Sequence, residues 1–424
     1  MQGEKQVITF KIKSNLTFTD GSKVAVHDIK RSWEYFARND KIKSAFMGAF
    51  ETVEDVVIKD TLNIQFVFKN FSQENLANLA LLKIIKIQTP VKENLELDDV
   101  IGCGEYILQT VTTLEIGLRP RDPQRPALIF KVVKDETTLA LKLINKEIDL
   151  SVASMSPRKV AWLKTQGKYI QTWELPSGNF VFMGLNHRKE IFKDLRVRKA
   201  LSFLIPREEI LKYKLKNTAM LSTGMFSPAF SEMYENTKYD AYDPKEAMKL
   251  LAAAGFGIHA KKIKIDWKVS NNKASIEVAE VIQHYFEKAG IEVDLTIQEW
   301  GTYMSSFKSG NFDVVVGQWV GFTVPDMLSF VYHSENTPPK GGNRVSYKNK
   351  DVDMLLNLAG VELNNEKRVE LFKRAQQLIR ADYASIDLWH PNIIWIGSSC
   401  LKNVELVPTG SFDSLPKVEK NCEK

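Results

Sequence analysis

Cysteine is scarce in this chain of 424 residues, which contains only Cys103, Cys400 and Cys422. Three cysteines at these spacings exclude a small domain framed by disulfides and any CxxC zinc or redox motif. Cys400 and Cys422 are close enough in sequence for a local bridge, and the odd number leaves at least one thiol free. A low cysteine content is compatible with an exported bacterial protein and with a cytosolic protein.

Long hydrophobic runs are missing as well. The most apolar stretch, residues 76–87 (LANLALLKIIKI), is interrupted by Lys83 and Lys86. It is shorter than the ~20 residues that a membrane-spanning helix needs. The N-terminus, MQGEKQVITF, has no basic region followed by an apolar one, so the chain as given shows no signal peptide. A removed leader and a truncated start both remain open.

The sequence motifs of common enzymes are absent. The chain has no GxxxxGK(S/T) phosphate loop, no GxSxG nucleophile elbow and no HExxH zinc motif. Gly102 and Gly104 begin a GxG, but Ile107 stands where the dinucleotide fingerprint requires glycine. The histidines are isolated, without the spacing that places two metal ligands on one helix face. We therefore expect no catalytic residues, no metal and no cofactor.

Positive charge exceeds negative charge only slightly. The chain has 58 lysines and arginines against 52 aspartates and glutamates, a net charge of +6 that is spread along its length. This distribution supports nucleic acid or anionic lipid only weakly as a partner and is typical of a solvated surface. A content of 44% hydrophobic and 26% charged residues is that of a globular protein, and the length predicts about two to four domains.

Hydrophobic periodicity predicts a mixed α/β protein. A period of two over residues 7–13 predicts a half-buried strand, and apolar residues three or four positions apart predict a helix from Val26 to Phe36. Strand and helix patterns then alternate towards the C-terminus. We expect further strands at residues 56–58, 62–68, 128–133, 181–185, 263–269, 291–297 and 312–316 and beyond 386, and helices at 137–144, 197–205, 245–254, around 278–286 and at 366–380.

Local residue types predict how several helices begin and end. Asp243 followed by Pro244 predicts an N-cap with proline at the first helical position. Gly255 and Gly290 predict helix ends, because glycine adopts the left-handed conformation that closes a helix. Arg196 and Arg198 follow Asp194 in an early helical turn, and we interpret them as structural, ion-pairing groups.

Six segments stand in a distinctive order over nearly the whole chain. They are residues 18–35 (FTDGSKVAVHDIKRSWEY), 102–106 (GCGEY), 135–150 (DET to IDL), 186–201 (N to DLRVRKAL), 242–256 (YDPKEA to AGF) and 299–319 (EW to FD and W). None is specific alone, since a DG turn or a helix ending in Ala-Gly is common. Together they resemble the family-5 extracytoplasmic solute-binding proteins, the receptors of oligopeptide, dipeptide and nickel ABC importers.

The resemblance implies a two-lobed α/β fold of the large type II periplasmic-binding-protein form. It implies lobe one over residues 1–179, lobe two over 180–394 and a return to lobe one over 395–424. A small solute (a peptide, a capped peptide or a sugar-like molecule) would lie in the crevice between the lobes, which close around it by hinge motion. A membrane permease would then recognise the closed form. We expect a monomer with no nucleic-acid partner, periplasmic or membrane-anchored outside the cell, and cytoplasmic only if the start of the chain is genuine.

The chain departs from this family in two places. Family members carry several tens of residues before the strand that begins here at Val7, so the N-terminal part of lobe one is expected to be missing. In the peptide-binding members, two arginines and one aspartate fix the charged ends of the peptide, and this chain has Phe307, Val316 and Phe322 at those positions. An unpaired buried ligand charge costs ~3–5 kcal/mol, which disfavours a free zwitterionic peptide unless other groups replace the anchors.

Four aromatic residues are the candidate ligand-binding residues. Trp300 and Trp319 keep the nineteen-residue spacing of two tryptophans in the peptide-binding members. With Phe307 and Phe322 they would form an aromatic wall for a sugar face, an apolar ligand or a capped peptide. Packing in the core is the alternative for all four rings. Asp326 is expected to cap the helix that follows it.

Two other functions compete with a transport receptor. A cytosolic sensor or regulator with the same fold would explain the absence of a leader. A hydrolase that uses His390 with Asp387 is the weakest hypothesis, because no nucleophile is evident near them in the sequence.

Overall fold

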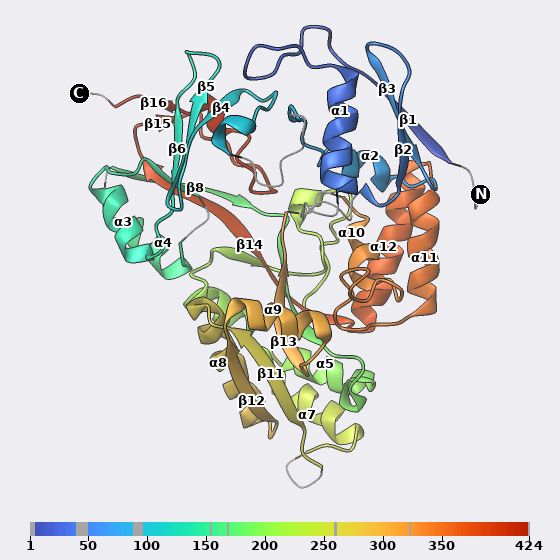
Figure 1. Ribbon diagram of the computed structural model, residues 1–424. Helices are drawn as coiled ribbons and strands as arrows, with labels where there is room; N and C mark the ends of the chain where they lie inside the picture. The colour runs from blue at the N-terminus through green and yellow to red at the C-terminus, as the bar shows by residue number, and fades with distance from the viewer. Residues whose placement is uncertain are drawn as a thin grey trace. The chain divides into compact units, whose positions relative to one another are not determined.

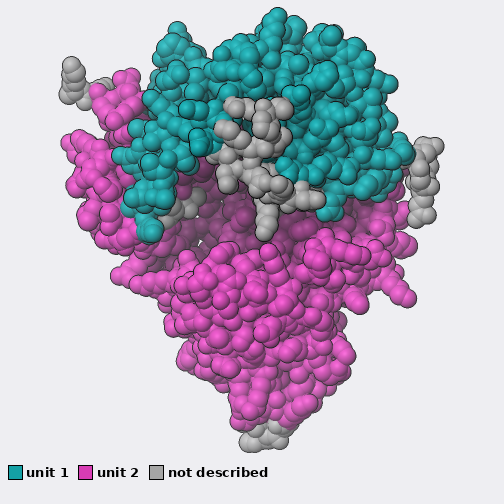
Figure 2. All heavy atoms as spheres, viewed as in Figure 1, with its two compact units in different colours: residues 1–134, 416–419 teal, residues 135–415, 420–424 magenta. Residues whose placement is uncertain are grey.

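The structure, a computed structural model, describes residues 5–39, 50–87, 96–152, 155–167, 169–257, 261–321 and 324–422. The chain divides into two compact units: Met1–Lys134 with Pro416–Glu419, and Asp135–Leu415 with Lys420–Lys424 (Figure 2). Both units combine helices with sheets, which confirms the predicted α/β class. In the part of the chain that the structure describes, no helix is both long and apolar enough to cross a bilayer.

The first unit contains two three-stranded antiparallel sheets, in the orders β1-β3-β2 and β4-β5-β6 (Figure 1). Alternate residues of β3 are buried against Trp33 of α1, as a strand covered on one face requires. The predicted first strand, first helix and hairpin are confirmed. The elements are β1 (Gln6–Lys11), α1 (Val26–Trp33) with a π-helical continuation (Glu34–Arg38), β2 (Val53–Ile58), β3 (Asn63–Phe68), α2 (Glu74–Leu79), β4 (Tyr106–Val111), β5 (Glu115–Pro120) and β6 (Leu128–Lys131).

The second unit is built on a sheet of order β10-β14-β9-β13-β11-β12, with β7 and β8 also paired to β14. Strands β11, β12 and β13 are parallel to one another, whereas β9 runs antiparallel to β13. The strands are β7 (Leu150–Val152), β8 (Ile170–Pro176), β9 (Phe180–Leu185), β10 (Ala219–Leu221), β11 (Lys264–Ser270), β12 (Glu292–Gln298), β13 (Val314–Trp319) and β14 (Ser385–Ser398), followed by the short β15 (Leu401–Lys402) and β16 (Glu419–Lys420).

Helices cover both faces of this sheet, so β9 is buried throughout. Val181, Met183 and Leu185 pack against α5, α7 and α8 on one face. Phe180 and Phe182 pack against α9, α10, α11 and α12 on the other face. The helices are α3 (Glu136–Ile144), α4 (Pro157–Leu163), α5 (Leu195–Phe203), α6 (Arg207–Glu209), α7 (Pro244–Ala253), α8 (Lys273–Lys288), α9 (Trp300–Ser309), α10 (Met327–Tyr332), α11 (Lys350–Val361) and α12 (Asn365–Ala381).

Strand β14 passes from one set of strands to another (Figure 1). Its first part, from Ser385, pairs with β9, and its second part, from Asn392, pairs with β8. The chain crosses in the opposite direction at residues 177–179, between β8 and β9. The Ser177 hydroxyl donates to the Pro391 carbonyl and accepts from the Asn179 backbone N–H at 3.0 Å, so it ties the two crossings together. The predicted lobe boundaries near 179 and 394 stay a prediction.

The predicted helix ends agree with the structure in most cases. Asp243 accepts from the Glu246 backbone N–H at 3.0 Å, and Gly255 and Gly290 have φ values of 85° and 82°. Cys400 and Cys422 form a disulfide, and Cys103 is free. The expectation that the Asp326 side chain caps α10 is wrong, because it makes no capping hydrogen bond and forms an ion pair with Arg368 of α12 instead.

The two arginines of the early α5 turn have different partners. Arg196 forms the expected ion pair with Asp194, at 2.6 Å. Arg198 instead donates to main-chain carbonyls, including those of Phe192 at 2.8 Å and Asp382 at 2.6 Å. Both arginines therefore have structural partners, but only Arg196 is directly ion-paired.

Candidate functional site

The carboxyl ends of three parallel strands meet at one edge of the large sheet. Strands β11, β12 and β13 end at Ser270, Gln298 and Trp319. In open α/β sheets, ligands bind in the crevice outside the carboxyl ends of the strands. This edge, with the residues that follow each strand, is the candidate functional site.

Among the described residues of this edge, Trp300 has the most exposed aromatic ring. It is the first residue of α9, and Glu299 before it accepts a hydrogen bond from the Gly301 backbone N–H at 2.7 Å. That cap fixes the helix start and hence the position of Trp300. Its side chain is 59% exposed, with the ring centre 5.9 Å from that of Tyr303. Val320, which follows β13, is 63% exposed, so the edge presents an apolar surface.

Phe307 and Trp319, in contrast, lie in the core behind this edge. Their exposed fractions are 3% and 8%. Trp319 stacks on Phe182 at 6.3 Å between ring centres, and Phe307 lies 6.5 Å from the same ring. The structure therefore brings Phe307 and Trp319 together and separates them from the solvent that Trp300 faces. Phe322 lies outside the described residues, and the ligand-binding role of the four rings stays a prediction.

Two buried polar atoms near the edge have no hydrogen-bond partner among the described residues: Nε1 of Trp319 and Oε1 of Gln298. Buried polar groups are almost always hydrogen-bonded to protein or water. Asn271, which follows β11, is exposed, and its backbone N–H donates to the Gln298 carbonyl at 2.8 Å. The edge therefore combines apolar surface with a few polar groups, which is the usual composition of a small-molecule site.

No motif or spacing in the sequence indicated Arg344, which lies beside Phe307 and Trp319. Its guanidinium carbon is 4.7 Å from the ring centres of both Phe307 and Trp319. Burial lowers the pKa of Arg344 from its ordinary value, and Tyr303 opposes that shift. The residue lies in the segment between α10 and α11, so neither the motif spacing nor the helical periodicity links it to α9 or β13.

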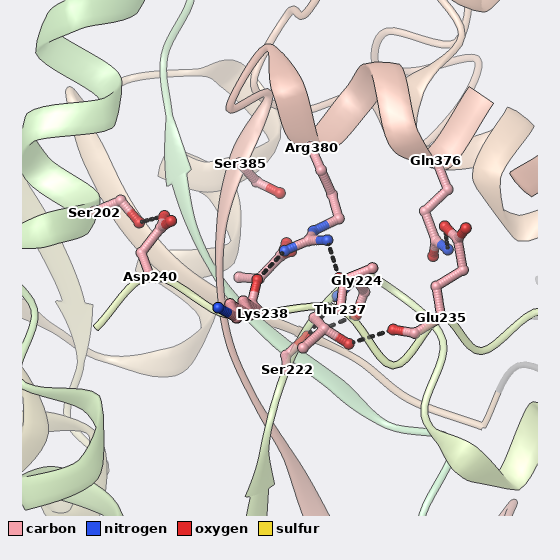
Figure 3. A network of polar contacts seen from close by, with 12 residues as sticks. Ser202, Ser222, Gly224, Glu235, Thr237, Lys238, Asp240, Gln376, Arg380 and Ser385 are labelled. Atoms are coloured by element: carbon pink, nitrogen blue, oxygen red, sulfur yellow. Dashed lines mark hydrogen bonds and ion pairs between the residues drawn. The ribbon is translucent and has the colours of Figure 1, made fainter. Parts of the chain in front are cut away.

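The pair considered for hydrolysis does not form a catalytic arrangement in the described structure. His390 is buried, with Nδ1 2.8 Å from the Asn179 carbonyl oxygen, and Asp387 forms an ion pair with Arg380 at 3.1 Å. Figure 3 shows that Arg380 also reaches the 235–240 segment, where it donates to the Lys238 carbonyl at 3.2 Å. These contacts anchor that segment to α12. Among the described residues, no group of three His, Cys, Asp or Glu side chains is placed to hold a metal ion.

Comparison with known families assigns the class of protein. A sequence model of the family described as "Bacterial extracellular solute-binding proteins, family 5 Middle" matches residues 2–342. The match covers well over half of the chain, and the chain therefore belongs to this family of solute-binding proteins. The family that the sequence motifs predicted is confirmed.

Individual relatives agree with this assignment. The dipeptide-binding protein of Escherichia coli (strain K12) is 26% identical over 386 residues, which cover 85% of this chain and 69% of the relative. The oligopeptide-binding protein AppA of Bacillus subtilis (strain 168) is 26% identical over 414 residues, which cover 90% and 75%. Both relatives are binding proteins.

Solved structures support the fold. A putative peptide binding protein AppA from Clostridium difficile superimposes with a TM-score of 0.84 at 20% identity, over 98% of this chain and 89% of that protein. The periplasmic-binding-protein-like fold implied by the motifs is thus confirmed. The expected loss of the N-terminal part of lobe one stays a prediction.

Proposed function

We propose that this protein is the receptor of an ABC importer, which captures a peptide or other small solute and delivers it to a membrane permease. The observation that carries the proposal is the 59% exposure of Trp300 at the carboxyl-end edge of the parallel strands. Membership of the solute-binding family and the names of the dipeptide- and oligopeptide-binding relatives support it.

Recognition in this proposal begins with stacking on Trp300. An indole ring offers a flat apolar face to a peptide side chain, a peptide plane or a sugar ring. Because Phe307 and Val316 replace two of the charged anchors of the peptide-binding members, we favour a capped peptide or a sugar-like solute over a free zwitterionic one. Asn271, which is exposed at the same edge, would supply polar contacts.

Capture requires movement about the two strand crossings, residues 177–179 and 389–392. The Ser177 and Pro391 contact keeps these crossings side by side, so they are suited to act as a hinge. Closure is stabilised only to the extent that the solute binds the closed state more tightly than the open state. We further propose that the protein acts as a monomer outside the cytoplasmic membrane.

The test is a solute screen with capped and free peptides, oligosaccharides and metal chelates. We expect one of these classes to raise the melting temperature and to make the protein more compact in small-angle X-ray scattering. The Trp300→Ala variant should then bind that solute more weakly by ~1–3 kcal/mol, since it loses a central aromatic contact.

Trp162→Ala is the matched control, because Trp162 lies on α4 and is 39% exposed. It should bind the solute as the wild type does. Equal weakening in both variants, or no response from the wild type to any solute class, would contradict the proposal.

A further inference from the structure

A cavity of the large unit lies away from the carboxyl-end edge. Its volume is about 730 Å³, within the range of small-molecule sites. His187 and Arg188 line it and directly follow β9, whose last residue, Leu185, pairs with Val314 at the start of β13. The candidate site, by contrast, is at the other end of β13, where Trp319 pairs with Phe180.

Positive charge dominates the lining of this cavity. Among the described residues of the lining, Asp382 is the one carboxylate, and its Oδ2 accepts from Tyr347 at 2.6 Å and Asn349 at 2.7 Å. Outside the lining, Glu190 pairs with Lys193 at 2.6 Å. Asp194, also outside the lining, acts electrostatically on Arg198. Against these three acids, the described lining has six cationic side chains: Arg188, Lys193, Arg198, Lys308, Arg344 and Lys348.

Arg188 and Arg198 donate hydrogen bonds to main-chain carbonyls, which do not neutralise the charge of either guanidinium. Arg188 donates to the Gly310 carbonyl at 2.8 Å at the end of α9, and Arg198 donates to the carbonyls of Phe192 and Asp382. Carbonyl oxygens satisfy N–H groups but carry no net charge. Both side chains thus have a structural role and still contribute to a positive potential in the cavity.

Arg344 has no such partner. Among the described residues, its guanidinium has no hydrogen bond and no carboxylate within ion-pair distance, although it is partly buried beside Phe307 and Trp319. Arginine presents a planar fork of donors that matches carboxylate and phosphate oxygens. Lys308 and Lys348 are exposed side chains of the same cavity and are free to turn towards a bound anion.

We propose that this cavity is a second binding site, for a small anion that carries two or more phosphate or carboxylate groups. The excess of cations over acids favours a multivalent ligand, because each added oxyanion group gains a charge-assisted hydrogen bond. The hydroxyl groups of Thr337 and Ser346 in the lining add neutral donors. The site shares Arg344 with the contacts to Phe307 and Trp319, and the proposed anion is a different ligand from the solute that would stack on Trp300.

The experiment is calorimetric titration of the full chain with inorganic pyrophosphate and with citrate in 150 mM salt, a condition chosen to be about physiological. Acetate, with a single charge, is the comparison ligand. We expect saturable binding of pyrophosphate or citrate at a stoichiometry near one, and much weaker binding of acetate. The Lys308→Gln/Lys348→Gln variant should lose about tenfold or more in affinity, since it lacks two charged donors.

The control variant is Lys245→Gln/Lys402→Gln, which removes two exposed lysines elsewhere and the same total charge. It should bind as the wild type does. Equal losses in both variants would show non-specific attraction and overturn the proposal, as would the absence of pyrophosphate and citrate binding. Flotation with phosphatidylglycerol vesicles but no binding of either anion would assign the cations to a lipid surface and overturn it as well.

Discussion

The guanidinium carbon of Arg344 lies 4.7 Å from the ring centre of Trp319. It is equally far from the ring centre of Phe307, so one side chain contacts two rings from different elements. Cation–π contacts of this kind are worth ~0.5–2 kcal/mol, depending on how far they are desolvated. They connect the segment between α10 and α11 to α9 and β13.

The Arg344→Lys variant should therefore be less stable than the wild type by ~0.5–2 kcal/mol. Lysine keeps the charge, but its ammonium group cannot lie flat against two rings. Urea unfolding followed by tryptophan fluorescence measures the difference. Arg374→Lys, at an exposed arginine of α12, is the control. Equal stability of both variants and the wild type would show that the two rings contribute nothing.

Trp300 and Trp319 should respond to substitution in opposite ways. Trp319→Ala should lower the free energy of unfolding by ~3–5 kcal/mol, because it leaves a cavity against Phe182. Trp300→Ala should change stability by less than ~1 kcal/mol, because the ring is 59% exposed. Chemical denaturation of the two variants tests this contrast, and a large loss on removing Trp300 would place that ring in the core.

Local patterns in the sequence predicted most elements of the fold, because they depend on residues close in the chain. The strand-like segment Val181–Leu185 predicted β9, and Asp243 with Pro244 predicted the start of α7. The order β9-β13-β11 and the long path of β14 depend on pairings between distant residues, which neither the periodicity nor the motifs predicted.

The candidate site was harder to predict for the same reason. The tryptophan spacing identified both Trp300 and Trp319 but did not predict how far each ring is buried. In the structure, Trp300 is exposed and Trp319 is buried. Arg344 and the cationic cavity are assembled from four separate segments of the chain, with no local motif to connect them. Asp326 precedes a helix, as a capping residue would, but its side chain forms an ion pair with the distant Arg368 and does not cap the helix.

The Asp326 and Arg368 ion pair is the next testable contact. Its two side chains are only 5% and 13% exposed, so removing one partner leaves a buried charge unpaired. Arg368→Met should cost ~3–5 kcal/mol in the free energy of unfolding. The double variant Asp326→Asn/Arg368→Met should recover part of that loss, since it buries no charge. A single variant as stable as the wild type in urea would contradict this view.

Histidine burial predicts a loss of stability in acid. Burial lowers the pKa of His390 from 6.5 to about 4, and the Asn179 carbonyl opposes this shift. The unfolded chain therefore binds more protons than the folded chain between these two values, so stability is fully present above pH 6.5 and falls as the pH drops towards 4. The expected contribution of His390 is on the order of 3 kcal/mol. His187, with its pKa also lowered to about 4, acts in the same direction.

The His390→Gln variant should consequently lose less stability than the wild type on acidification. At neutral pH it should be the less stable protein, because glutamine fills the buried site and reaches the Asn179 carbonyl less well. The difference between the two proteins should narrow by on the order of 3 kcal/mol towards pH 4. Urea unfolding in a series of buffers from pH 4.5 to 7.5, roughly the range over which a shifted histidine titrates, measures it. Parallel curves for the two proteins would show that His390 does not cause the acid sensitivity.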